Sequence, residues 1–197
     1  MGRERHHVAL VAAVLAAPVH ARMTGKPGKT SAEIADAAHW DAVEEVVELL
    51  HEERFRDAIV ELRDVLRADA ANAYAYYFLG IAFFEIGELE PARDAYAACL
   101  KLAPGHIGAR VALSHVLRAT GNVKGAIREG VDALARSPGH VDALHAVGLA
   151  YHAYGDEVAA RRYFEAFLAS HPEYEAAEEV KEILATLPGG REPEEID

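Results

Sequence analysis

Residues 73–106 read AYAYYFLGIAFFEIGELEPARDAYAACLKLAPGH, and this stretch decides the fold. Tyr76, Leu79 and Phe83 recur at the three- and four-residue spacing of one helical face, which predicts a first helix. A glycine then breaks the pattern, and a second helix ends at Pro104, because proline cannot continue the helical hydrogen-bond ladder. The stretch therefore predicts two antiparallel helices.

The same features recur along the chain with a period of 34 residues. A fixed period of this length is typical of repeat architectures, in which each unit buries its apolar face against the next. The aligned columns are Gly87, Gly121 and Gly155; Ala58, Ala92, Ala126 and Ala160; Pro104, Pro138 and Pro172; and Gly80, Ser114 and Gly148.

This pattern resembles the tetratricopeptide repeat family. The residues that meet the family's signature here are Tyr76, Leu79, Gly80, Phe83, Ala92, Tyr96 and Pro104. The resemblance implies an all-α fold, a right-handed α-solenoid of antiparallel helix pairs. We expect a domain over 33–187 with units at about 39–72, 73–106, 107–140 and 141–174.

Two units depart from the signature. The first has Glu45 and Val46 in place of the Leu-Gly step, as is common in terminal repeats with one side in solvent. The third has Gly130 where an aromatic residue is expected. An apolar stripe over 175–187 predicts a helix that caps the last repeat, and the acidic stretch 188–197 is predicted to be disordered.

Residues 1–32 form a leader with two interpretations. Basic residues, an apolar run and a small-residue site ending at Ala21 resemble a secretory signal, and cleavage there would make the protein periplasmic or secreted. Basic residues after the run oppose export, and a true start at Met23 would leave a cytoplasmic protein with a flexible leader. The run is too short to span a bilayer. Thr30 and Glu33 have capping-box spacing, so a helix is predicted to begin near Ser31.

Composition excludes several function classes. The chain has 51% hydrophobic residues, enough for a packed core, and a net charge of -12, which argues against a nucleic-acid partner. The stretch 33–72 holds twelve acids against four bases, whereas 107–140 holds five bases against two acids. A basic region therefore lies in the middle of an acidic protein.

The residues that suggest chemistry also have simpler interpretations. Gly28-Lys29-Thr30 resembles the end of a phosphate-binding loop, but Met23 stands where that loop needs a glycine. The eleven histidines lack the spacing of a metal site, and Cys99 is expected to pack in the core. We predict no catalytic residues, no cofactor and no metal. His106 and His140 each follow a Pro-Gly turn, which favours a structural role.

In the family that this chain resembles, the first helices of successive units line a concave groove that holds a partner segment. By register, the residues that face this groove are Tyr74, Tyr77, Ile81, Phe84, Val111, His115, Arg118, His145, Leu149 and His152. For some of them, such as Ile81 and Leu149, the alternative is that the side chain packs against a neighbouring helix and does not contact a partner. Tyr74 and Tyr77 suit a partly solvent-exposed binding surface, because tyrosine combines an apolar ring with a polar hydroxyl.

Family members that clamp a carboxyl terminus use lysine and asparagine on these faces. The counterparts here are Val43, Val47, Phe78 and Gly108, which argues against such a clamp. The aromatic and apolar residues beside Arg118 favour an amphipathic or aromatic-bearing segment.

The sequence therefore predicts a non-enzymatic adaptor or scaffold that binds a peptide or helix of another protein. Two alternatives stay open. One is a self-assembling protein, in which the acidic first unit packs onto the basic region of a neighbour. The other is a regulatory subunit of an enzyme complex that has no catalytic activity of its own.

Overall fold

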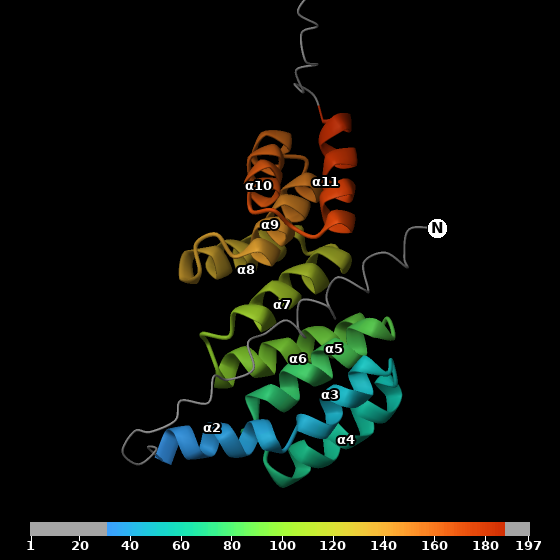
Figure 1. The fold of residues 1–197 in the computed structure, drawn as a ribbon, viewed down its shortest axis with the longest axis vertical. Helices are drawn as coiled ribbons and strands as arrows, with labels where there is room; N and C mark the ends of the chain where they lie inside the picture. The colour runs from blue at the N-terminus through green and yellow to red at the C-terminus, as the bar shows by residue number, and fades with distance from the viewer. Residues whose placement is uncertain (1–30, 188–197) are drawn as a thin grey trace, which may run out of the picture.

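The computed structural model describes residues 31–187, and every regular element within them is an α-helix (Figure 1). The helices are α2 (Ser31–Asp41), α3 (Glu44–His51), α4 (Phe55–Ala68), α5 (Ala73–Glu85), α6 (Leu89–Leu102), α7 (Ile107–Ala119), α8 (Val123–Arg136), α9 (Val141–Tyr154), α10 (Glu157–Ala169) and α11 (Tyr174–Thr186).

Helices α3 to α10 pack as consecutive pairs, α3 with α4, α5 with α6, α7 with α8 and α9 with α10. Each pair also contacts the next, which gives an elongated stack of pairs (Figure 1). Helix α11 packs against α10 at the end of the stack. The predicted fold class, an all-α solenoid of helix pairs, is confirmed.

Four of the described helices, α5, α7, α8 and α10, begin at a side-chain cap. The side chains of Asn72, Asn122 and Asp156 each accept the backbone N–H of the residue three positions later. His106 does the same for α7, with its Nδ1 accepting the N–H of Ala109 at 3.0 Å. Each cap satisfies an N–H that has no partner inside the helix. The predicted structural role of His106 is confirmed.

Within the second and fourth pairs, a glycine lets the two helices approach closely. A Cβ on Gly80 would lie 2.5 Å from the ring of Tyr96, and one on Gly148 would lie 2.6 Å from the ring of Phe164. Both aromatic side chains are fully buried. In these two pairs, the glycine of the first helix therefore packs against the aromatic residue of the second helix.

In the third pair, the small and large residues occupy different columns. Gly130 stands in the aromatic column, and a Cβ there would lie 2.5 Å from Cγ2 of Val147 on α9. Ser114 stands in the glycine column, and its hydroxyl donates to the carbonyl oxygen of Ala126 at 2.8 Å. Because α8 packs this closely onto α9, the side chain of the next repeat fills the space that an aromatic ring fills elsewhere.

Helix α2 extends the stack at its N-terminal end and packs on α5 (Figure 1). The buried amide of Asn72 donates to the carbonyl oxygen of His39 at 2.8 Å. The hydroxyl of Tyr74 donates to Asp36 at 3.0 Å, and the ring of Trp40 meets that of Tyr74 edge-on at 5.4 Å. A helix does begin at Ser31, as predicted.

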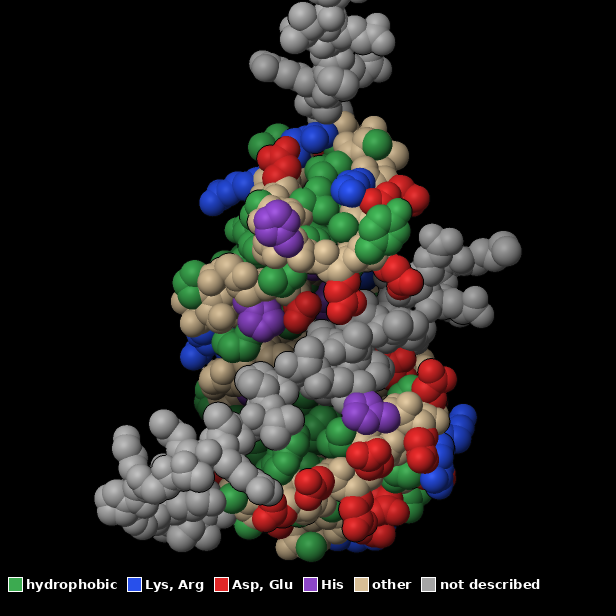
Figure 2. All heavy atoms as spheres, viewed as in Figure 1, with side chains coloured by type: hydrophobic (Ala, Val, Ile, Leu, Met, Phe, Trp, Pro, Cys, Tyr) green, Lys and Arg blue, Asp and Glu red, His purple; other side chains and the backbone are tan. Residues whose placement is uncertain are grey.

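Acidic side chains gather at the end of the stack that α2, α3 and α4 form (Figure 2). Helix α3 contributes Glu44, Glu45 and Glu48, and Glu52 follows directly after it; all four are exposed. The negative charge that the sequence places in 33–72 is therefore presented to solvent at this end of the molecule.

Helix α11 is fixed at its C-terminal end by a residue of the preceding repeat. The guanidinium of Arg161 on α10 donates to the carbonyl oxygens of Leu184 and Leu187 at 3.3 and 3.0 Å. These carbonyls lie in the last turn of the helix and just after it, where no backbone N–H of the helix is available to donate to them. Val180 on α11 is also fully buried against the last repeat.

Several sequence predictions fall outside residues 31–187. These are the secretory or flexible leader, the capping residue Thr30, the Gly28-Lys29-Thr30 motif and the tail 188–197. Among the helices of the described residues, none has the length and apolar content needed to cross a bilayer. The same residues hold no group of three or more potential metal ligands.

Candidate partner-binding face

Helices α5, α7 and α9 are the first helices of three successive pairs, and each contacts the next along the stack. The ten residues predicted to line a groove all lie on these three helices. We call this set the inner face. Its residues divide into a buried apolar part and a partly exposed polar part.

The apolar part consists of residues that are at most 9% exposed. It comprises Tyr77, Ile81, Phe84, Val111 and Leu149. Their burial shows that they pack against other side chains of the chain, which was the alternative stated for Ile81 and Leu149. Whether they also touch a partner stays a prediction.

Tyr77 is the most enclosed of the predicted tyrosines. Its ring centroid lies 4.4 Å from that of His106 and 5.5 Å from that of Phe78. Its hydroxyl comes so close to Gly108 that a Cβ on that glycine would lie 2.8 Å away. Burial raises the pKa of Tyr77 well above its ordinary value. The ring therefore joins α5 to α7, whereas the sequence predicted a side chain partly exposed to solvent.

Tyr74 is half-buried, as expected, but its polar end is engaged within the chain. Burial and the hydrogen bond to Asp36 raise the pKa of its hydroxyl to about 12. Together with the contact to Trp40, this places Tyr74 under α2.

Apart from Tyr74, the polar part of the inner face comes from α7 and α9. The rings of His115 and His145 lie 6.2 Å apart, and His145 stacks on Phe167 of α10 at 4.9 Å. His152 is exposed. His115 and His145, which the register assigns to the same face in successive units, therefore lie side by side.

Arg118 lies near the C-terminal end of α7 and is half-buried. Burial lowers the pKa of its guanidinium, and the charge of Glu179 on α11 opposes that shift. Its Nε is buried and has no hydrogen-bond partner among the described residues. A cation withdrawn from water in this way is incompletely compensated.

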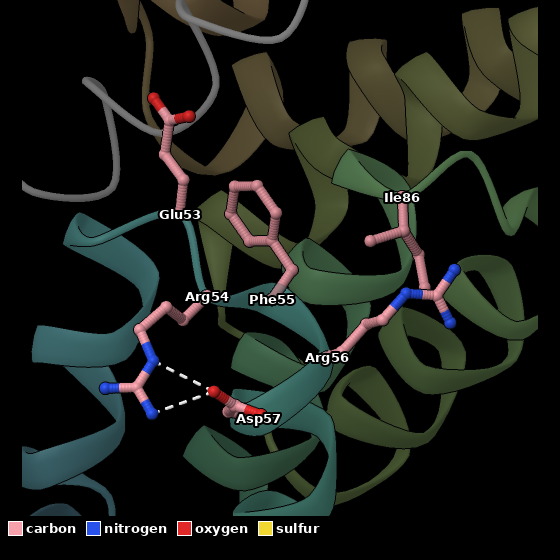
Figure 3. A pocket seen from close by; sticks show the side chains of 6 residues that line it. All are labelled: Glu53, Arg54, Phe55, Arg56, Asp57 and Ile86. Carbon is pink, nitrogen blue, oxygen red and sulfur yellow. Dashed lines mark hydrogen bonds and ion pairs between the residues drawn. The ribbon is translucent and has the colours of Figure 1, made fainter.

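Two surface hollows lie away from this polar part. One, of about 290 Å³, is formed at the turn between α3 and α4, where Arg54 pairs with Asp57 at 2.8 Å (Figure 3). The other, of about 320 Å³, is formed by side chains of α4, α5 and α6. The first is lined by Glu53, Arg54, Phe55, Arg56, Asp57 and Ile86, and the second by Arg63, Tyr76, Leu79, Phe83, Pro91, Asp94 and Ala95.

Comparison with known proteins agrees with this architecture. Residues 44–107 match the model of the tetratricopeptide repeat family. A crystal structure of MamA is 28% identical, with 70% of this chain and 86% of that chain covered and a TM-score of 0.56. Residues 44–107 therefore carry tetratricopeptide repeats, and the described chain has the fold of proteins built from them. No curated protein sequence matches it significantly.

Two further tetratricopeptide repeat structures share the fold at 19% identity. TTC0263 of Thermus thermophilus aligns over 74% of this chain and 82% of its own, with a TM-score of 0.64. The first such domain of Spaghetti (RPAP3), bound to the HSP90 peptide SRMEEVD, aligns over 58% and 94%, with a TM-score of 0.52. Proteins of this fold thus include one with a bound peptide.

The repeat register missed the residues that connect repeats to flanking helices. Asn72, Arg161 and Glu179 act between α2 and α5, between α10 and α11, and between α11 and α7. Only Asn72 carried a usable signal, since an asparagine directly before an apolar helical pattern predicts an N-cap.

Proposed function

We propose that this protein is a non-enzymatic adaptor that binds an acidic, amphipathic segment of another protein along the inner face. The observation that carries the proposal is the half-buried guanidinium of Arg118, whose Nε has no hydrogen-bond partner among the described residues. A carboxylate of the partner would complete its hydrogen bonding. The peptide seen on a protein of the same fold supports a role in protein interaction.

The energetic reason is that a buried cation needs a paired anion. Glu179 is the carboxylate whose charge acts on Arg118 within the described part of the chain. A partner carboxylate that accepted hydrogen bonds directly from the guanidinium would form a charge-assisted contact, which is about twice as strong as a neutral hydrogen bond. Arg118 therefore supplies specificity for an acidic residue.

The neighbouring histidines extend the same site. His115 and His145 lie side by side, and His152 is exposed further along α9. Aromatic rings with polar edges suit a segment that presents both apolar and polar side chains, such as an amphipathic helix.

A clamp for a carboxyl-terminal peptide is a poorer fit. Of the four counterparts of the clamp residues, Val43 and Phe78 are buried and Gly108 lies beneath the hydroxyl of Tyr77. None of these side chains can donate a hydrogen bond to a carboxylate. The peptide bound to RPAP3 is therefore no guide to the sequence of the partner here.

The test is cross-linked affinity capture from extract of the source cells, followed by mass spectrometry. The protein is compared with an Arg118→Gln, His152→Ala variant. The matched control is Arg128→Gln, an exposed arginine on α8. We expect at least one captured protein to be lost with the double variant and kept with the control.

Two results would reject the adaptor role. Equal recovery of the same proteins by all three forms would remove the inner face from binding. Recovery of the protein's own chain alone, with oligomers that dissociate in salt, would favour self-assembly through the acidic first unit and the basic 107–140 region. A captured enzyme whose activity changes on binding would specify the adaptor as a regulatory subunit.

A further inference from the structure

A second surface lies at the edge of the stack where α9 turns into α10. It consists of aromatic, basic and aliphatic side chains from α8, α9 and α10, and it shares no residue with the inner face. We call it the outer edge, and its residues are Lys124, Tyr151, Tyr154, Val158, Arg162 and Tyr163.

The outer edge exposes large apolar side chains to solvent. Tyr154 is 52% exposed and Val158 is 83% exposed. Val158 is among the large apolar side chains that the described residues leave in water, and it lies at the first turn of α10 beside the end of α9. Adjacent exposed apolar residues of this kind mark interaction surfaces more often than single ones do.

Two cations are held over aromatic rings at this edge. The ammonium of Lys124 lies 5.9 Å from the ring centroid of Tyr154, and the guanidinium carbon of Arg162 lies 5.7 Å from that of Tyr163. The rings of Tyr163 and Tyr151 stack at 5.5 Å, almost parallel. Ring contacts fix both cations without neutralising them.

Neither cation has a carboxylate partner within residues 35–187, unlike most other basic residues there. Ion pairs engage, for example, Arg54, Arg67, Arg93, Arg110 and Lys181. Of the acids in the same turn, Asp156 accepts the N–H of Ala159 as the cap of α10, and Glu157 is next to it. In a chain of net charge -12, these two cations thus lie beside exposed apolar groups without a carboxylate partner among residues 35–187.

We propose that the outer edge docks an acidic peptide segment of a partner protein, one that carries an aliphatic side chain between its carboxylates. The aliphatic group would cover Tyr154 and Val158, and the carboxylates would meet Lys124 and Arg162. Charge complementarity selects this occupant over a neutral or basic one. The protein would then hold two partner segments at once, one at each surface.

The test uses a short fluorescein-labelled peptide that repeats Glu-Glu-Leu, with Gln-Gln-Leu as its uncharged counterpart. Binding to the full chain is measured by fluorescence anisotropy at low and high salt. We expect the Lys124→Gln, Arg162→Gln double variant to bind the acidic peptide about tenfold more weakly, since each exposed charge contact contributes severalfold. Tyr154→Ala should weaken binding and Tyr154→Phe should keep it.

The matched controls separate this surface from the inner face. Lys101→Gln removes an exposed lysine on α6, and Arg118→Gln removes the inner-face guanidinium. Lys101→Gln should leave the affinity for this peptide unchanged. The loss that Lys124→Gln, Arg162→Gln causes should be the same in an Arg118→Gln background, so the proposal survives even where the adaptor role of the inner face fails.

Four outcomes would overturn the proposal. They are equal binding of the Gln-Gln-Leu peptide, an unchanged affinity of the double variant, tighter binding of oligouridylate than of the acidic peptide, and binding that appears only after deletion of residues 188–197. The third would make the edge a nucleic-acid surface, and the last would make the chain's own acidic tail its occupant.

Discussion

The ring of Tyr96 on α6 fills the space beside Gly80 on α5 so completely that a Cβ at residue 80 would lie 2.5 Å from its Cε1 atom. Tyr96 is fully buried, and its ring also lies 6.1 Å from that of Tyr77. The distance between the two helices of this pair is therefore set by one glycine and one tyrosine.

A Gly80→Ala substitution should push the two helices apart. The added methyl overlaps the ring, which has no free space to move into, so we expect a loss of about 1–3 kcal/mol in the free energy of unfolding. Urea denaturation followed by circular dichroism measures it. Gly105→Ala is the control, because a Cβ there meets nothing within 4 Å. Equal stability of the two variants would show that the Tyr96 ring can move aside to accommodate the methyl group.

A Glu53→Gly substitution should stabilise the protein. Glu53 has φ of 57° at the turn between α3 and α4, where the other three pairs have Gly87, Gly121 and Gly155 with φ of 80° to 85°. A side chain in this left-handed region costs about 1 kcal/mol, partly offset by the freedom that glycine gains in the unfolded chain. We therefore expect a gain of about 0.5 kcal/mol by urea denaturation.

Gly121→Ala tests the same cause in reverse. No atom lies within 4 Å of the Cβ position at this glycine, so the expected loss of about 1 kcal/mol is conformational. A loss of stability in both variants would refute the assignment of strain to the turn at Glu53.

Glu85 should make stability fall as pH rises. Burial, with a smaller effect from the charge of Glu53, raises the pKa of Glu85 from 4.5 to about 8. Between these values the folded chain holds a proton that the unfolded chain has lost, so rising pH favours unfolding until the folded carboxyl also ionises.

A Glu85→Gln variant should remove this slope. We expect equal stability near pH 4 and an advantage of about 1–2 kcal/mol for the variant near pH 9, since the partly exposed carboxyl feels solvent screening. Thermal unfolding across this pH range measures it, with Glu61→Gln, an exposed carboxyl on α4, as the control. Parallel curves for Glu85→Gln and the native protein would contradict the prediction.

Asn72 serves two contacts that can be separated. Its side-chain oxygen caps α5 at the N–H of Ala75, and its amide nitrogen donates to the carbonyl oxygen of His39. Asn72→Ala should lose both and cost about 1–3 kcal/mol.

Asn72→Asp keeps the cap and loses the donor to α2. We expect it to leave the repeats stable and to increase hydrogen exchange within α2 alone. Unchanged exchange in α2 would mean that the contacts of Trp40 and Tyr74 hold that helix without the amide.

Local patterns were enough to predict the repeats. Aromatic, glycine, alanine and proline columns report helix, turn and close packing within a few residues, so Gly80, Tyr96, Gly87 and Pro104 each carried their own structural meaning. His106 could be assigned a structural role because it recurs after a Pro-Gly turn. The ten inner-face residues also fell on the three helices that register assigned them.

Burial within that face depended on the neighbours. Tyr77 and Tyr74 look alike in the sequence, but one ring is enclosed by α6 and α7 and the other lies under α2. Helical period specifies the side of a helix on which a residue lies, whereas the depth of burial is set by side chains that arrive from distant segments.

The sequence by itself determined the repeat fold, because its period and breakers act within each unit. Only the tertiary structure decided how the units connect to their surroundings. The exchange of sizes at Ser114 and Gly130 depends on Val147 of the next repeat, and the last turn of α11 depends on Arg161. Contacts between segments far apart in the chain cannot be recognised from the sequence period, because each of them occurs only once and does not repeat.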